Sequence, residues 1–190
     1  MTSAGARPDR APGSIILRPM VAADWPEVEA IYRAGIATGR ATFEPAPPRD
    51  WAAFDASRRA DLRLVAAGAD GTMLGWAAAT SVSAREVYRG VVEHSIYVHP
   101  DAGGTGVGSR LLAAFIELTE ARGVWTIQSA VIAENAASLR LHERAGFRVV
   151  GRRERIARMT TGPLAGTWCD TIFIERRSAV VGADDREAAT

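Results

Sequence analysis

The sequence has little of what stabilises small secreted proteins or builds metal centres. It contains one cysteine, Cys169, and three scattered histidines in 190 residues, so no intramolecular disulfide can form and no metal-ligand spacing is present. It also lacks an apolar run of about 18 residues and a basic segment followed by an apolar stretch. We therefore expect no metal, no membrane span, no secretory signal and a cytoplasmic location.

An excess of charge is also missing. The 23 Lys and Arg residues nearly balance the 22 Asp and Glu residues, giving a net charge of +1, so there is no electrostatic reason to expect a nucleic acid partner. A hydrophobic content of 47% over this length is enough for one sizeable core. Residues 1–14 and 178–190 show no periodicity and are predicted to be disordered tails, which leaves one domain over 15–177.

Strand and helix patterns alternate along this domain. Helices are predicted after Asp24, over 50–59, from about Gly106, and between Asn135 and Gly146. Apolar alternation and short apolar runs predict strands, which begin at 15–17 and continue at 62–67, 73–80, 91–98, 126–132, 147–156 and 167–176. The predicted fold is a mixed α/β sheet with helices on both faces.

A glycine-rich turn follows the strand predicted at 91–98 and opens a helix. Its four glycines leave backbone N–H groups uncovered, and the helix adds its positive dipole end, so the turn is suited to an anion such as pyrophosphate. No lysine follows the glycines, as a P-loop would require, and the turn lies past mid-chain, unlike a Rossmann loop. The turn consists of Gly103, Gly104, Thr105, Gly106, Val107, Gly108 and Ser109.

A second motif lies about thirty residues further on. Asn135 is a good helix N-cap. Because a helix turns about 100° per residue, offsets of three and seven place Ser138 and His142 on the same face as Asn135. This polar stripe is predicted to face one common site.

Together these motifs resemble the GNAT superfamily of acyl-CoA-dependent N-acyltransferases over about residues 15–177. Within it, the chain is similar to the phosphinothricin and methionine sulfone acetyltransferases through 41–44, 91–100, 141–142 and 168–170. The resemblance implies a mostly antiparallel sheet that splays in the middle and acetyl-CoA as cosubstrate. It also implies transfer of acetyl to a small amino acid analogue such as phosphinothricin, methionine sulfone or methionine sulfoximine, for detoxification, by a homodimer.

The resemblance also implies which residues bind the cofactor. These are Ile96, Val98, His99 and Pro100, the glycine turn, Asn135 and Ser138. The Val98 N–H, beside a bulge expected before His99, is the natural donor to the thioester oxygen as negative charge develops. Relatives carry Arg or Gln ahead of the glycines where this chain has Asp101 and Gly103, so we expect weaker long-range attraction of the cofactor.

Two residues are candidates for catalysis. An amine attacks a thioester only when neutral, so a proton acceptor is needed. Glu93 matches the glutamate proposed as the base in the family, and we expect it to be partly desolvated with a raised pKa; alternatively, strand alternation simply places it on a wet face. His142 replaces the usual tyrosine near the departing thiolate, where it donates a proton, forms a hydrogen bond or is only structural.

Substrate recognition is expected near the loop before the central strand. Arg85 and Arg89 are candidates to bind acidic oxygens, with Phe43, Ser95 and Tyr97 lining the pocket. The alternatives are solvated arginines and aromatic side chains that belong to the core. Two other functions remain open at this point: an acyltransferase for a peptide or protein amine, and a non-catalytic acyl-CoA sensor.

Overall fold

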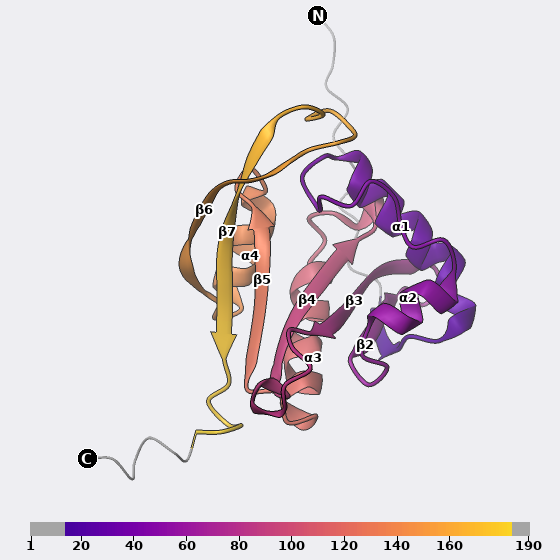
Figure 1. Cartoon of the computed structure of the whole chain (residues 1–190). Coiled ribbons are helices and arrows are strands. Elements are labelled where there is room, and N and C mark those ends of the chain that lie inside the picture. Colours follow the sequence, from indigo (N-terminus) through magenta and orange to yellow (C-terminus); the bar gives the residue numbers. More distant parts are fainter. Residues whose placement is uncertain (1–13, 184–190) are drawn as a thin grey trace, which may run out of the picture.

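The computed structural model describes residues 14–183 and contains one seven-stranded sheet in the order β1-β2-β3-β4-β5-β7-β6 (Figure 1). The strands are β1 Ile16–Pro19, β2 Arg63–Ala67, β3 Met73–Ser81, β4 Val91–Val98, β5 Thr126–Ile132, β6 Arg148–Arg158 and β7 Trp168–Arg177. The helices are α1 Trp25–Ala37, α2 Trp51–Ser57, α3 Val107–Ala121 and α4 Ala136–Arg144, with short 3-10 turns at Ala22–Asp24, Glu86–Tyr88 and Pro100–Ala102. The predicted α/β class is confirmed, and the ends of β4 and β5 lie where the sequence places them.

The helices cover the two faces of the sheet (Figure 1). One core cluster joins α1 and α2 to β3 through side chains such as Ile31, Phe54 and Trp76. The other joins α3 to the opposite face through Leu111 and Phe115, with α4 packed at its edge. Each fully buried apolar side chain of this kind stabilises the fold by about 1.5–3 kcal/mol, so both helical layers hold the sheet firmly.

The sheet divides between β4 and β5. These neighbours are parallel, whereas the other strand pairs are antiparallel, and their register covers only Val91–Glu93 against Thr126–Gln128. Beyond that point the two strands diverge (Figure 1). We call this divergence the fork; its apex is the pair Glu93 and Gln128. The fork is the splay that the family resemblance implies.

The expected bulge before His99 is not found. The register of β4 with β3 runs without a shift from Val92 to Val98, and the next amide, that of His99, donates to the carbonyl oxygen of Leu74 at 2.8 Å. The antiparallel ladder continues through this point because both strands are extended and the chain turns only at Pro100. Any special role of Val98 must therefore come from the fork.

Side-chain caps begin two of the helices. The Asp50 carboxylate accepts from the Ala53 N–H at 2.8 Å at the start of α2, and the Asn135 side chain accepts from the Ser138 N–H at 3.1 Å at the start of α4. Asp24 precedes α1 but does not cap it with its side chain. Its carboxylate accepts from Arg18 instead, which lowers the pKa of Asp24.

Most of the two predicted tails lies outside the described residues: 1–13 of the N-terminal tail and 184–190 of the C-terminal tail. Past Arg177 the described chain remains hydrogen bonded. The Ser178 N–H donates to Trp125 at 2.9 Å, and its hydroxyl accepts from the amides of Val180 and Val181 at 3.0 Å. The structured part of the chain thus extends beyond the boundary expected at 177, because this turn closes against the start of β5.

Candidate functional site

Glu93 lies at the apex of the fork. It is paired with Thr80 of β3 and Gln128 of β5, and alternation along β4 places its side chain on the α1 face with Ser95 and Tyr97. Contrary to the expected partial burial, Glu93 is exposed. The reason is that α1 approaches β4 further along, where Gly35 lies against the Tyr97 ring. The carboxylate is consequently accessible from solvent beside the opening strands.

The edge of β4 beyond the apex is unpaired on its β5 side. Because the His99 N–H donates to β3, and because amides alternate in direction along an antiparallel strand, the N–H groups of Ile96 and Val98 point away from β3. They face the space that β5 has left. The fork therefore presents a short row of backbone hydrogen-bonding groups to a ligand lying between the strands.

The glycine turn forms a concave row of amides next to this edge. Gly104 and Gly106 have φ of 78° and 86°, which favour glycine, and a Cβ at either position would meet nothing within 4 Å. Gly106 is the N-cap of α3 and has no side chain to satisfy the first turn. Because the first helical bond runs from the Arg110 N–H to the Gly106 carbonyl at 3.1 Å, the N–H groups of Val107, Gly108 and Ser109 have no intrahelical acceptor. We call this row the amide cradle.

Two predicted binding residues of the turn are used internally. The Gly103 N–H donates to the Pro100 carbonyl at 3.2 Å, and the Thr105 hydroxyl donates to the Ala102 carbonyl at 2.7 Å. These bonds close the 3-10 turn that precedes the cradle. Gly103 and Thr105 therefore shape the turn, while the open amides lie at Gly104 and from Gly106 onward.

Gly108 brings three predicted motifs together. A Cβ at this position would lie 3.4 Å from a methyl group of Val98 on β4 and 3.4 Å from a methyl group of Leu141 on α4. Only a very small residue allows α3 to begin this close to both elements. The open edge of β4, the amide cradle and α4 thus form one continuous site.

Asn135 serves as a cap and a tether. Besides capping α4, its side-chain amide donates to the Arg40 carbonyl at 3.0 Å, which ties α4 to the loop between α1 and α2. The Ser138 hydroxyl lies 3.3 Å from Nδ1 of His142. The predicted polar stripe on α4 exists, but its groups largely bind one another and the neighbouring loop.

His142 is buried beneath the fork and is 2% exposed. Its Nδ1 lies 2.7 Å from the Ser138 carbonyl oxygen, and its Nε2 lies 2.8 Å from Nε2 of His94. Burial lowers the pKa of His142. Both ring nitrogens are occupied within the fold, so the geometry does not support the expectation that His142 gives a proton to a departing thiolate.

His94 is a site residue that sequence reasoning missed. It is 3% exposed and packs between Phe115 and Phe147, and its Nδ1 lies 3.2 Å from the Gln128 carbonyl oxygen at the apex. Burial, together with repulsion from His142, lowers the pKa of His94 to about 3. The available signal was a polar residue on the inward face of β4 beside Val92.

The two expected catalytic residues lie on opposite faces of the sheet. Glu93 points toward the α1 face, whereas His94, the next residue, points toward α4 and contacts His142. Alternation along β4 explains the separation. Glu93 and His142 consequently do not form one proton-transfer pair.

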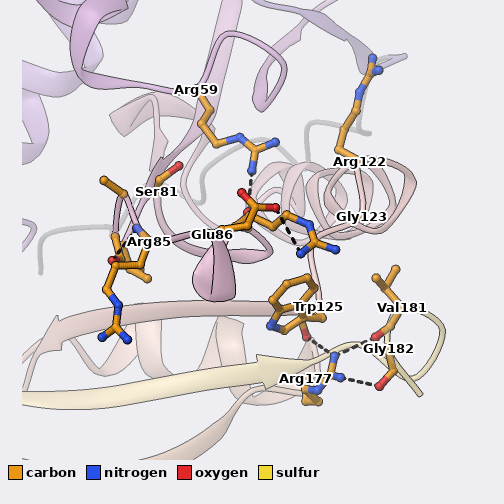
Figure 2. Close-up of a pocket in the computed structure, with 14 residues that line it drawn as sticks. Arg59, Ser81, Arg85, Glu86, Arg122, Gly123, Trp125, Arg177, Val181 and Gly182 are labelled. Atoms are coloured by element: carbon orange, nitrogen blue, oxygen red, sulfur yellow. Dashed lines mark hydrogen bonds and ion pairs between the residues drawn. The ribbon is translucent and has the colours of Figure 1, made fainter. Parts of the chain in front are cut away.

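Arg85 and Arg89 line a hollow of about 1410 Å³ at the start of β4 (Figure 2). The Arg85 guanidinium lies 5.4 Å from the centre of the Tyr88 ring, and that of Arg89 lies 5.3 Å from the centre of the Trp125 ring. Three further arginines line the hollow: Arg59, Arg122 and Arg177. Among the described residues that line it, Glu86 is the one carboxylate. The hollow is therefore strongly basic.

The other residues expected at the substrate pocket lie elsewhere. Tyr97 is 9% exposed and stacks on Trp76 with ring centres 4.6 Å apart, as the core interpretation predicts. Phe43 is half-buried and packs against Ile132 and Met159, beside the end of β5. Among the described residues, none of Glu93, Phe43, Ser95 and Tyr97 lines the arginine hollow.

Among residues 14–183, no three side chains of His, Cys, Asp and Glu gather closely enough to hold a metal ion. No helix in this part of the chain has the length and apolar character needed to cross a bilayer.

Comparison with known proteins identifies similar sequences and structures. Residues 25–147 match the acetyltransferase (GNAT) family. The chain is 36% identical to the L-methionine sulfoximine/L-methionine sulfone acetyltransferase of Pseudomonas paraeruginosa, covering 85% of this chain and 94% of the relative. It is 37% identical to the phosphinothricin N-acetyltransferase of Alcaligenes faecalis, covering 80% and 77%. A GNAT superfamily phosphinothricin acetyltransferase from Sinorhizobium meliloti, solved with acetyl-CoA, superposes with a TM-score of 0.77 at 30% identity, covering 89% and 91%.

Proposed function

The chain belongs to the acetyltransferase (GNAT) family, and from this premise we propose that it transfers acetyl from acetyl-CoA to the amino group of a small amino acid analogue. Phosphinothricin, methionine sulfone and methionine sulfoximine are the proposed substrates, because relatives named for them cover most of this chain. The proposed biological role is detoxification of such compounds in the cytoplasm.

The observation that carries the proposal is the fork that leads into the amide cradle. The exposed backbone groups of Ile96 and Val98 suit the amide groups of pantetheine, which would add to β4 as a further strand does. The open N–H groups at Gly106 to Ser109, with the positive end of α3, suit the pyrophosphate. The residues present therefore fit acetyl-CoA, although the exposed Asp101 carboxylate beside the turn adds negative charge near the proposed pyrophosphate site.

The catalytic step follows from groups along β4, from the apex to the open edge. Because Val98 lies further along the extended strand than Glu93, Glu93 accepts the proton of the substrate ammonium through water, so that the neutral amine attacks the acetyl carbonyl carbon. The Val98 N–H donates to the carbonyl oxygen as negative charge develops on it. The carbon–sulfur bond then breaks, the nitrogen releases its second proton to solvent, and the departing thiolate takes up one proton from solvent. The products are the N-acetylated amine, the free thiol and one net proton, which Glu93 returns to solvent.

Arg85 and Arg89 are proposed to hold the acidic oxygens of the substrate. Among residues 14–183, Arg85 has no acidic partner within ion-pair distance, and Arg89 has only Glu86 at 3.4 Å. Their guanidinium groups are thus available for bidentate contacts.

Replacing Arg85 or Arg89 by alanine should raise the KM for an acidic substrate about tenfold while the KM for acetyl-CoA stays unchanged. The matched control is Arg33→Ala, on the exposed face of α1 beside Glu29; equal KM values in all three variants would contradict the assignment.

A homodimer is also proposed. The apolar segment 171–174 lies in β7 between two other strands, where Thr171 and Ile174 are buried, so it belongs to the sheet and its core. Four exposed apolar side chains lie together on the edge strand β6 and at the start of β7 beside it: Val149, Val150, Ile156 and Trp168. This surface is the better candidate for contact with a second copy.

The decisive experiment measures thiol release from acetyl-CoA with a panel of amines. The panel contains phosphinothricin, methionine sulfone, methionine sulfoximine, ordinary amino acids and a peptide amine. Selective turnover of the first three supports the proposal. Turnover of the peptide alone would assign a peptide or protein acyltransferase, and binding of acetyl-CoA without turnover of any amine would assign a sensor.

A further inference from the structure

The strongest unexplained feature outside the proposed chemistry is the buried pair His94 and His142. Through this pair three elements meet: His94 belongs to β4, its Nδ1 faces Gln128 of β5, and its Nε2 faces Nε2 of His142 on α4. All of this lies directly behind the apex of the fork. The pair is therefore placed to determine how β4, β5 and α4 are held relative to one another.

The hydrogen-bonding partners of the two rings limit which ring nitrogens carry a hydrogen. Each Nδ1 faces a backbone carbonyl oxygen, which only accepts hydrogen bonds. Two neutral rings carry two N–H groups, but three contacts require a ring hydrogen: the two to carbonyl oxygens and the one between the rings. The fourth contact, 3.3 Å between the Ser138 hydroxyl and Nδ1 of His142, requires none, because the hydroxyl can turn its own hydrogen elsewhere. If both hydrogens were on Nδ1, two bare Nε2 lone pairs would face each other at 2.8 Å, which is repulsive.

A third proton would satisfy every contact but would place a positive charge in an apolar enclosure. The rings are packed against Phe115 and Phe147, and no carboxylate among residues 14–183 forms an ion pair with either ring. Burying an unpaired charge is costly, and the pKa values of both histidines are lowered accordingly. The pair is thus neutral at neutral pH, with two hydrogens for three contacts.

The distances favour one assignment of the two hydrogens, on the rule that the shortest contacts carry them. The contact between His142 Nδ1 and the Ser138 carbonyl is the shortest, at 2.7 Å, and requires a hydrogen on that nitrogen. The 2.8 Å contact between the two Nε2 atoms then requires its hydrogen on His94. The longest contact, 3.2 Å from His94 Nδ1 to the Gln128 carbonyl, is the one left without a hydrogen.

We infer that His94 is a positioning residue for acetyl transfer, which donates from Nε2 to His142, fixes His142 in its Nδ1-protonated tautomer and locks α4 beneath the fork. The inference rests on the proposed function for its link to catalysis. α4 contacts the amide cradle through Leu141 and the α1–α2 loop through Asn135. A shift of α4 would therefore displace the bound thioester from Glu93 and from the Val98 N–H.

The first test is spectroscopic and requires no activity. The chain has only three histidines, so long-range ¹H–¹⁵N spectra of histidine-labelled protein resolve each ring, and His99→Gln assigns the third signal set. We expect opposite tautomers at neutral pH: His142 protonated only at Nδ1 and His94 only at Nε2. The same tautomer in both rings, a proton on Nε2 of His142, or a ring protonated at both nitrogens would overturn the inference.

The second test separates positioning from simple packing. His94→Leu keeps an apolar volume but removes the donor, and we expect kcat to fall about ten- to a hundredfold with an unchanged KM for acetyl-CoA. His94→Gln retains an amide donor within reach of His142 and should restore most of the rate. Wild-type kcat in His94→Leu, or equal damage in both variants, would refute the role. If the leucine variant does not fold, the rate of the glutamine variant and the wild-type spectrum still test the role of His94. If no amine is acetylated, the proposed function fails, but the spectrum still tests the two tautomers.

Discussion

Along β4, neighbouring side chains leave the sheet on opposite sides, so Glu93 and His94 have different surroundings although a peptide bond joins them. Glu93 is open to solvent, where its carboxylate can exchange protons with an incoming ammonium. His94 is enclosed, and its Nε2 faces the ring of His142 and not solvent. At the apex, the proposed base Glu93 is therefore accessible on one face of the sheet, and the His94–His142 pair is buried on the other.

Replacing Glu93 by glutamine should reduce kcat/KM at neutral pH by about a hundredfold, because the amide cannot accept the proton. Binding of acetyl-CoA, measured by calorimetry, should remain unchanged, since the carboxylate lies away from the cradle. Glu117→Gln, on the exposed side of α3, is the matched control and should keep the wild-type rate. Full turnover by the Glu93 variant across the pH range would show that another group is the base.

Burial of His94 predicts a stability that depends on pH. Its pKa is about 3 in the folded chain and about 6.5 in the unfolded chain. Between these values the unfolded chain binds a proton that the folded chain does not, so the free energy of unfolding falls as the pH falls, by about 1.4 kcal/mol per pH unit well below pH 6.5. His142 acts in the same direction.

Urea unfolding of the wild type and of His94→Leu between pH 6.5 and 4.5 measures this effect. The carboxylates with lowered pKa, such as Asp24 and Glu120, lose their contribution mainly below that range. The leucine variant should therefore show a shallower dependence on pH, by about one proton per molecule. Parallel curves for the two proteins would mean that His94 is not the group that titrates.

Among the elements, the start of α3 has a backbone geometry that favours glycine. Gly106 combines a left-handed conformation with a position at the head of the amide cradle. Its neighbours on β4 and α4 approach closely enough to exclude larger residues at Gly108. A change at the cradle should consequently affect both stability and cofactor binding.

Gly106→Ala should lower the free energy of unfolding by about 1 kcal/mol, because an L residue is strained at this φ. It should also raise the KM for acetyl-CoA, since a methyl group would enter the open space that the cradle faces. Gly71→Ala is the matched control: Gly71 has φ of 84° and lies in the β2–β3 turn with no atom near a built Cβ. The control should show the stability loss alone; a similar KM in both variants would argue against the cradle as the pyrophosphate site.

Elements were more predictable from the sequence than the contacts between them. The ends of β4 and β5 follow from apolar patterns and flanking glycines, and the Asn135 cap follows from local chemistry. The partnership of His94 with His142 could not be predicted, because it joins residues 48 positions apart through the packing of α4 under the sheet. Whether Glu93 is covered also depends on where α1 crosses β4, which no local pattern encodes.

At the scale of the whole molecule, the β6 edge carries several exposed apolar side chains close together. Val149 is 62% exposed and Trp168 is 57% exposed, and no other strand covers β6 on its outer side among residues 14–183. A second copy of the chain would bury these side chains.

Val149→Asp should therefore convert the proposed dimer to a monomer, because a charge would be buried in the interface. Light scattering during size-exclusion chromatography measures the mass directly. Val180→Asp is the control: Val180 is 74% exposed but lies beyond β7, away from this edge. A wild-type protein that already elutes as a monomer, or a dimer that survives the Val149 change, would exclude this surface as the interface.

The three-residue pairing of β4 with β5 has a consequence for amide hydrogen exchange. In most sheets the central strand exchanges its amides most slowly, because both of its edges are bonded. Here the amides of Tyr97 and His99 face β3, whereas those of Ile96 and Val98 face the fork. Fast and slow amide exchange should thus alternate from residue to residue along the end of β4. Acetyl-CoA should slow only the fast-exchanging amides, so the protected residues would show where the cofactor lies along the strand.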